Sequence, residues 1–264
     1  MRSIKLNNIE LITAAYAVES FPHSVPARRG EDITVPYRDG ARHVTRKPFD
    51  VRKEPLNMWV RGVNTSGVVP PGKTQRQQLE LNIEYLKSLF ATSGQVALRV
   101  GMLDGTYRTA QVEILSAINF IKSANYAKMS VELLFADPFF YSDTLVTETI
   151  ELTSGSVSVN LTNAGTAPVK KGIITITGIT SNCKISNTTN SISCTYTGVL
   201  ADDVEAVISL TNQTVKIGGE NYLGFLTHLG APEWFVLNPG TNAIEITGDT
   251  YGGSVEISYY PAYI

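Results

Sequence analysis

The pattern of apolar and polar positions predicts one clear helix in this chain, over residues 75–90. Four apolar residues recur at intervals of four, three and four and so share one helical face: Leu79, Ile83, Leu86 and Phe90. Thr74 and Gln77 have the spacing of a capping box, in which each side chain satisfies a free N–H group at the helix start. Gly94 is the expected stop. The apolar face is expected to pack on a sheet.

Short strands in the rest of the first half would supply that sheet. They are runs of alternating polarity, rich in β-branched and aromatic residues and bounded by Gly, Pro, Asn and Asp. We expect strands over residues 3–6, 9–17, 33–35, 49–51, 56–62, 96–100, 106–115 and 127–135.

From about residue 145 onward the pattern has period 2 almost throughout, with turns rich in Gly and Asn. We expect strands over residues 145–152, 156–161, 172–178, 191–196, 205–210, 214–217, 234–237, 243–247 and 254–259. Strands of this length with these turns are typical of a two-sheet antiparallel sandwich. The predicted fold is therefore mainly β, with a β-rich domain carrying one α-helix (1–143) followed by an antiparallel β-sandwich (144–264).

Charge divides the chain at the same place. Before Thr144 there are eighteen basic and fourteen acidic residues, a net of +4, whereas the rest has four basic and ten acidic residues, a net of −6. Between the halves lies an aromatic stretch, residues 137–143, which we name the junction segment. Its residues are predicted to form an inter-domain hinge: Asp137, Pro138, Phe139, Phe140 and Tyr141. A proline fixes its own φ and favours an extended residue before it, which sets the direction of the chain here.

A Pro- and Arg-rich stretch in the first domain, residues 21–53, is named the basic tract. Within it, Arg28 and Arg29 stand close to Glu31 and Asp32. Such a run either forms salt links across a subunit boundary or is a solvated loop that neutralises its own charge. Composition leaves both interpretations open, and these four residues are our candidates for an oligomer interface.

The two cysteines also allow two interpretations. If residues 187–190 form a hairpin turn, Cys183 lies directly opposite Cys194, within disulfide range. The alternative is a pair of reduced thiols that pack as small apolar residues, as expected of a protein made in a cytoplasm.

No catalytic or cofactor motif is readable. The histidines, His23, His43 and His228, have no partner at a metal-ligand spacing, and P-loop, dinucleotide and Gly-x-Ser-x-Gly motifs are missing from the sequence. We therefore expect no metal, no organic cofactor and no enzyme activity. A hydrolase whose carboxylates meet only on folding is the competing hypothesis.

Two further properties narrow the class of protein. A pI of about 6.0 argues against a dedicated nucleic-acid-binding protein. The apolar stretch near the start, residues 11–18, is far shorter than the about 20 residues of a membrane-spanning helix. It also lacks the basic region of a signal peptide. Synthesis in a cytoplasm is expected.

Aromatic residues of the predicted sandwich could form either its core or a surface on which sugars stack. They are Tyr222, Phe225, Trp234 and Phe235. Of these, Tyr222 and Trp234 are our candidate glycan contacts.

Several segments occur in an informative order. Residues 26–40 (PARRGEDITVPYRDG), the capped helix followed by Ala97-Leu98-Arg99, and residues 131–141 (VELLFADPFFY) lie in the first half. Residues 161–169 (LTNAGTAPV), 238–242 (NPGTN) and 260–263 (YPAY) follow in the second. In order and spacing these segments resemble the distal tail (Dit) proteins of long-tailed siphophages over essentially the whole chain.

The resemblance implies a structural protein of the virion. Dit proteins form a six-fold ring around the tail channel and join the tail tube to the hub and fibre proteins, and their C-terminal domains are often galectin-like or similar to carbohydrate-binding modules. For this chain it implies a homohexamer at the tail tip, made in the host cytoplasm and contacting tail tube, hub and fibre proteins, with a host cell-surface glycan as a further candidate partner. DNA would pass through the channel without specific binding. The alternative is a free-standing carbohydrate-binding or adhesin module.

Overall fold

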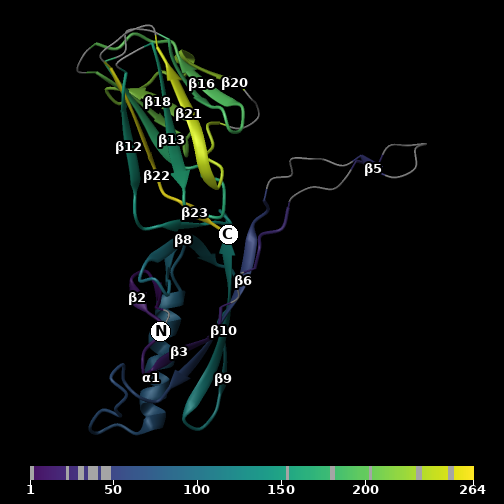
Figure 1. Cartoon of the computed structure of the whole chain (residues 1–264). Coiled ribbons are helices and arrows are strands. Elements are labelled where there is room, and N and C mark those ends of the chain that lie inside the picture. Colours follow the sequence, from purple (N-terminus) through teal and green to yellow (C-terminus); the bar gives the residue numbers. More distant parts are fainter. Residues whose placement is uncertain are drawn as a thin grey trace. The chain divides into compact units, whose positions relative to one another are not determined.

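In the computed structural model the chain forms two compact units, one of residues 1–140 with Ile264 and one of residues 141–263 (Figure 1). The structure describes residues 3–21, 24–28, 33–34, 41–42, 49–152, 155–178, 182–201, 204–229, 234–248 and 253–264. The sequence predicts two domains, 1–143 and 144–264. That each of them folds independently stays a prediction.

The first unit is built on an antiparallel sheet in the order β2-β1-β7-β8-β10-β6-β3, with β9 paired to β10. Its strands are β1 (Ile4–Leu6), β2 (Ile9–Glu10), β3 (Tyr16–Ser20), β6 (Arg52–Arg61), β7 (Val96–Gly101), β8 (Tyr107–Ile114), β9 (Asn119–Lys122) and β10 (Tyr126–Phe135). β6 and β10 pair along their whole length, from Arg52 opposite Phe135 to Arg61 opposite Tyr126. Two short strands of the basic tract, β4 (Ile33–Thr34) and β5 (Ala41–Arg42), pair only with each other.

The predicted helix is confirmed as α1 (Gln75–Phe90), and its apolar face is buried against β6. Its capping box is present: the Gln77 N–H donates to Thr74 Oγ1 at 3.2 Å, and the Thr74 N–H donates to Gln77 Oε1 at 2.8 Å. The helix is capped at Ala91, so Gly94 lies beyond its end. In the described part of the chain, no helix is long and apolar enough to cross a membrane.

A buried polar pair on α1 fixes the end of β6. The Asn82 amide donates to the backbone carbonyls of Arg61 and Val63, at 2.7 and 2.8 Å, and its oxygen accepts from Gln78 at 2.9 Å. Two backbone groups where the strand ends are thereby satisfied by a side chain rather than by water.

Two predicted strands of the first unit are wrong. Residues 49–51 make only an isolated bridge at Phe49, before β6 begins at Arg52. Residues 9–17 were expected to form a single strand, but β2 and β3 are separate. The Glu10 carboxylate accepts from the backbone N–H groups of Ile4 and Ile12, and Thr13 Oγ1 accepts from those of Ala15 and Tyr16. These side-chain acceptors replace the ladder bonds of a continuous strand and turn the chain.

The second unit is the predicted antiparallel sandwich. One sheet has the order β12-β22-β14-β17-β18-β19 and the other β13-β21-β15-β16-β20. The first comprises β12 (Val146–Glu151), β14 (Gly172–Thr177), β17 (Glu205–Ser209), β18 (Thr214–Ile217), β19 (Glu220–Asn221) and β22 (Ser254–Tyr259). The second comprises β13 (Ser156–Asn163), β15 (Cys183–Asn187), β16 (Ile192–Tyr196), β20 (Leu226–Leu229) and β21 (Gly240–Thr247). Short β11 (Phe140–Ser142), β23 (Ala262–Tyr263) and the 3₁₀ turn η1 (Leu223–Phe225) complete the elements.

Each sheet of the sandwich buries alternate residues, as expected when two sheets pack face to face. Ile174, Ile176 and Ile257 come from one sheet, and Ile185 and Ile246 from the other. The predicted fold class, a mainly β chain with one helix followed by an antiparallel sandwich, is therefore confirmed.

The predicted strand over residues 234–237 is replaced by a segment that asparagine side chains hold. Asn187 and Asn190 both donate to the Val236 carbonyl, each at 2.8 Å, and Leu237 makes an isolated bridge to Val169. Side-chain donors thus satisfy the Val236 carbonyl, and the segment pairs with Val169 only at Leu237 among the described residues.

The predicted pairing of the two cysteines is also wrong. The turn comprises residues 188–191, so Cys183 lies opposite Tyr196 and Cys194 opposite Ile185. Asn190 Oδ1 accepts from the Ile192 N–H, and Ser191 takes a left-handed φ of 59°, which places the turn one residue later than expected. Both thiols are free and buried, and burial raises the pKa of each to about 12. Thiols in this state are poor nucleophiles.

Candidate functional site

The basic tract folds back on itself where its two ends leave the sheet. Arg28 forms an antiparallel bridge with Phe49, and the Asp50 N–H donates to the Ala27 carbonyl at 2.8 Å. Farther along, Ile33 lies opposite Arg42. The described parts of the tract thus pair in two places, at Arg28–Phe49 and at β4–β5.

Of the four candidate interface residues, the structure describes Arg28. Its side chain is exposed, and the guanidinium carbon lies 3.9 Å from the centroid of the Phe49 ring. Arg29, Glu31 and Asp32 lie outside the described residues.

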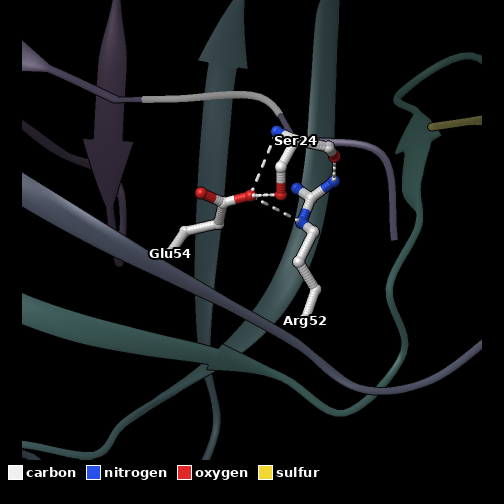
Figure 2. A network of polar contacts seen from close by, with 3 residues as sticks. All are labelled: Ser24, Arg52 and Glu54. Atoms are coloured by element: carbon white, nitrogen blue, oxygen red, sulfur yellow. Dashed lines mark hydrogen bonds and ion pairs between the residues drawn. The ribbon is translucent and has the colours of Figure 1, made fainter. Parts of the chain in front are cut away.

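A buried ion pair closes the base of the tract (Figure 2). Arg52 and Glu54 lie two residues apart on β6, are 3% and 2% exposed, and place Nε 3.5 Å from Oε1. Ser24, where the tract has just left β3, satisfies both charges. Its carbonyl accepts from Arg52 Nη1 at 3.2 Å, while its N–H, at 3.1 Å, and its hydroxyl donate to Glu54 Oε1.

Aromatic rings complete the environment of Arg52. The guanidinium carbon lies 4.4 Å from the centroid of Phe135, at the end of β10, and 5.1 Å from that of Phe140 in the junction segment. Phe135 and Phe140 also contact each other, with centroids 5.6 Å apart. A guanidinium is weakly hydrated and stacks well on rings, so an arginine suits this position and a lysine does not.

Burial lowers the pKa of Arg52, and the neighbouring Glu54 carboxylate works against that shift. The Nη2 atom is buried and lacks a hydrogen-bond partner among the described residues. The charge is therefore retained at some cost, and the arrangement depends on Glu54 and Ser24 remaining in place.

The residues of the predicted hinge contact different parts of the chain. Asp137 Oδ1 accepts from the Phe139 N–H at 3.3 Å, which shapes the turn around Pro138. Phe139 is buried and packs edge-on against Phe49 of the basic tract, with centroids 5.1 Å apart. In the second unit, Lys171 Nζ lies 4.7 Å from the centroid of the Tyr141 ring.

The second unit carries an exposed aromatic pair. Tyr222 and Phe225 are 40% and 41% exposed, and their rings are parallel within 6° with centroids 5.7 Å apart. Beneath them Tyr196 packs edge-on against Phe225. Burial, and then the proximity of Tyr222, raises the pKa of Tyr196. Of the two candidate glycan contacts, Tyr222 thus lies in an exposed pair, whereas Trp234 is half-buried beside the buried Phe235.

Sequence reasoning missed the Ser24–Arg52–Glu54 network. The one available signal was an arginine and a glutamate two residues apart at the start of a strand, which places them on the same face. Among the described residues, no group of three or more His, Cys, Asp or Glu side chains is placed to hold a metal ion.

Comparison with known proteins agrees with this architecture. Residues 164–263 match the family model described as the siphovirus-type tail component, C-terminal domain. The fold is similar to that of the crystal structure of the Dit protein of phage SPP1, which its title calls a paradigm of the hub adsorption apparatus in phages that infect Gram-positive bacteria. The two chains share 14% sequence identity with a TM-score of 0.67, and the similarity covers 98% of each. A search of curated proteins found no match.

The family model matches residues 164–263 and supports a structural component of a siphophage tail. The match lies in the second unit, and the similarity of fold continues through the first. The whole chain therefore shares the fold of SPP1 Dit, and its second unit is similar to the C-terminal domain of siphovirus-type tail components.

We predict that Glu54→Gln destabilises the first unit by about 3 kcal/mol, because it leaves a buried guanidinium without its counter-charge. Urea unfolding at neutral pH, followed by the fluorescence of Trp59, measures this. The control is Glu19→Gln, which breaks the half-exposed Glu19–Lys128 pair (3.6 Å) and is expected to cost less than about 1 kcal/mol. Equal losses in the two variants would contradict a buried charge pair at Arg52.

Proposed function

We propose that this protein forms a hexameric ring at the distal end of the tail, joining the tail tube to the tail tip or baseplate and its host-adhesion proteins. The observation that carries the proposal is the fold shared with SPP1 Dit along both units, together with the family-model match. Its role is structural rather than catalytic. Its partners would be other copies of itself, the tail tube protein, and the hub and fibre proteins.

The first unit is the ring-forming part in this proposal, and the basic tract lies at or near the subunit contact. The two ends of the tract pair at Arg28 and Phe49, and the tract combines basic and acidic residues close together. Charge pairs at the rim of an interface fix its register more than they add affinity. Arg28, Arg29, Glu31 and Asp32 would form these pairs.

The ring would let DNA pass without binding it specifically. Phosphate affinity grows with the number of cations that can reach the backbone. Several cations of the first unit already have acidic partners: Lys122 contacts Glu80 at 2.7 Å and Lys128 contacts Glu19 at 3.6 Å. The mixed charge supports weak rather than tight contact with DNA.

Reversing the charge of the tract tests the placement of the subunit contact. We expect Arg28→Glu with Arg29→Glu to lower the assembly size or raise the concentration at which the chain assembles, as measured by light scattering after size exclusion. Lys170→Glu with Lys171→Glu makes the same change in charge at an adjacent pair of the second unit and should leave assembly unaltered. If both double variants assemble like the unaltered chain, the tract is not at the contact.

A glycan-binding role is the second candidate function, either within the tail tip or as a free-standing module. The exposed Tyr222–Phe225 pair favours it, since sugar C–H faces pack well on flat rings. Trp234 would be a neighbouring contact. Similarity of fold alone is weak support for a ligand.

We expect Tyr222→Ala to weaken binding of the full chain to cell-wall polysaccharide about tenfold, the loss typical of one aromatic contact. A glycan array followed by titration of the best saccharide measures this. Tyr260→Ala is the matched control, because Tyr260 is a similarly exposed tyrosine of the same unit. Failure of the unaltered chain to bind any saccharide, or equal weakening in both variants, would leave the second unit a structural spacer.

A further inference from the structure

The base of the basic tract and the junction segment share one packing environment within the first unit. Two sets of contacts join them. In one, Arg28 lies over Phe49, which packs edge-on against Phe139. In the other, Arg52 is hydrogen-bonded to Ser24 and lies over Phe140.

Ser24 completes the second set of contacts by its hydrogen bonds to Arg52 and Glu54. It is itself exposed, but it covers an ion pair that is almost completely buried. If the tract left this position, Glu54 would lose two hydrogen bonds and Arg52 would lose its contact with the Ser24 carbonyl. Water would then reach both charges, and a hydrated guanidinium no longer favours the apolar faces of Phe135 and Phe140.

The junction segment depends on the same guanidinium. Phe140 is 3% exposed, and the cation lies against its ring. Tyr141, the next residue, begins the second unit. The last buried residue before the second unit is therefore held in part by a side chain that needs the tract in place.

We propose that Arg52 is a positioning residue that couples the seating of residues 24–28 of the basic tract to the order of the junction segment. With the tract seated, Ser24 caps the ion pair, Arg52 stays between the rings, and residues 137–140 are fixed. With the tract displaced, the same side chain is solvated and the junction segment gains freedom. The two segments thus become ordered or mobile together, in one local opening equilibrium.

A consequence follows for assembly, and it rests on the proposed ring. If a neighbouring subunit seats the basic tract, ring formation also orders the segment that leads into the second unit. The coupling itself is a property of the single chain, so its test does not depend on the ring.

Hydrogen exchange of the full chain, read by mass spectrometry at a dilution that keeps it monomeric, tests the coupling. The informative variant is Arg52→Met with Glu54→Met, because replacing both charges of a buried pair by apolar side chains keeps the core packed and the unit folded. We expect amides of residues 24–28 and of 137–143 to exchange at least about tenfold faster in this variant, as when charge-assisted hydrogen bonds that anchor a segment are lost. Amides of α1 should be unchanged.

Lys53→Met is the matched control, because Lys53 lies between the two residues on the same strand and is exposed. It should leave both segments unchanged. Single Arg52→Met is a second variant, expected to affect both segments more strongly. Faster exchange of residues 24–28 with unchanged exchange of 137–143, or no difference from Lys53→Met, would overturn the coupling.

Discussion

A buried guanidinium must find a counter-charge, hydrogen-bond acceptors and flat surfaces to pack on, and Arg52 draws these from separate parts of the first unit. Glu54 supplies the charge, Ser24 supplies the acceptor, and Phe135 and Phe140 supply the rings. The long strands β6 and β10, Ser24 near the start of the basic tract, and the junction segment therefore meet at one side chain. An apolar residue could fill the space, but it would not tie these segments to each other.

In the second unit, neutral side chains rather than charged ones hydrogen-bond to buried backbone groups. Buried asparagines satisfy backbone segments that leave the sandwich sheets: Asn163 donates to the Ala167 and Leu237 carbonyls, and Asn242 accepts from the Asn238 N–H. Close to the first of these, a side chain at Gly165 would collide with the Ala262 carbonyl, so only glycine fits. The family-model match begins directly after Asn163 and covers its two acceptors, as well as Gly165 and the Asn238–Asn242 turn. The distinctive features of this unit thus lie in its connections rather than in its strands.

Local patterns predicted most of the regular structure. The helix, its capping box and the long strands were readable because periodicity and end signals agreed. The predictions that failed did so because the local structure depends on particular side-chain hydrogen bonds and turn conformations. Periodicity does not reveal these. Glu10 and Thr13 broke a strand, Asn187 held residues near Val236 away from a ladder, and a turn at Ser191 shifted the register of the cysteines.

The candidate sites were less predictable than the fold. Tyr222 could be chosen as an aromatic in a loop, but its parallel partner Phe225 emerges only from the fold. The Ser24–Arg52–Glu54 network unites residues about thirty positions apart, and charge patterning gives no sign that such a pair is buried. Composition predicts a hinge over residues 137–143, which stays a prediction, whereas the contact between Arg52 and Phe140 is visible only in the structure. Burial and long-range pairing are properties of the fold and not of local sequence.

We propose that this chain assembles into a closed ring. The most direct measurement is the native mass of the purified full-length chain at micromolar concentration, combined with class averages from electron microscopy. We expect a particle of about 172 kDa, six times the 28.7 kDa of one chain, with six-fold symmetry around an open channel. A monomer of 28.7 kDa over the whole concentration range, or an assembly without six-fold symmetry, would contradict it.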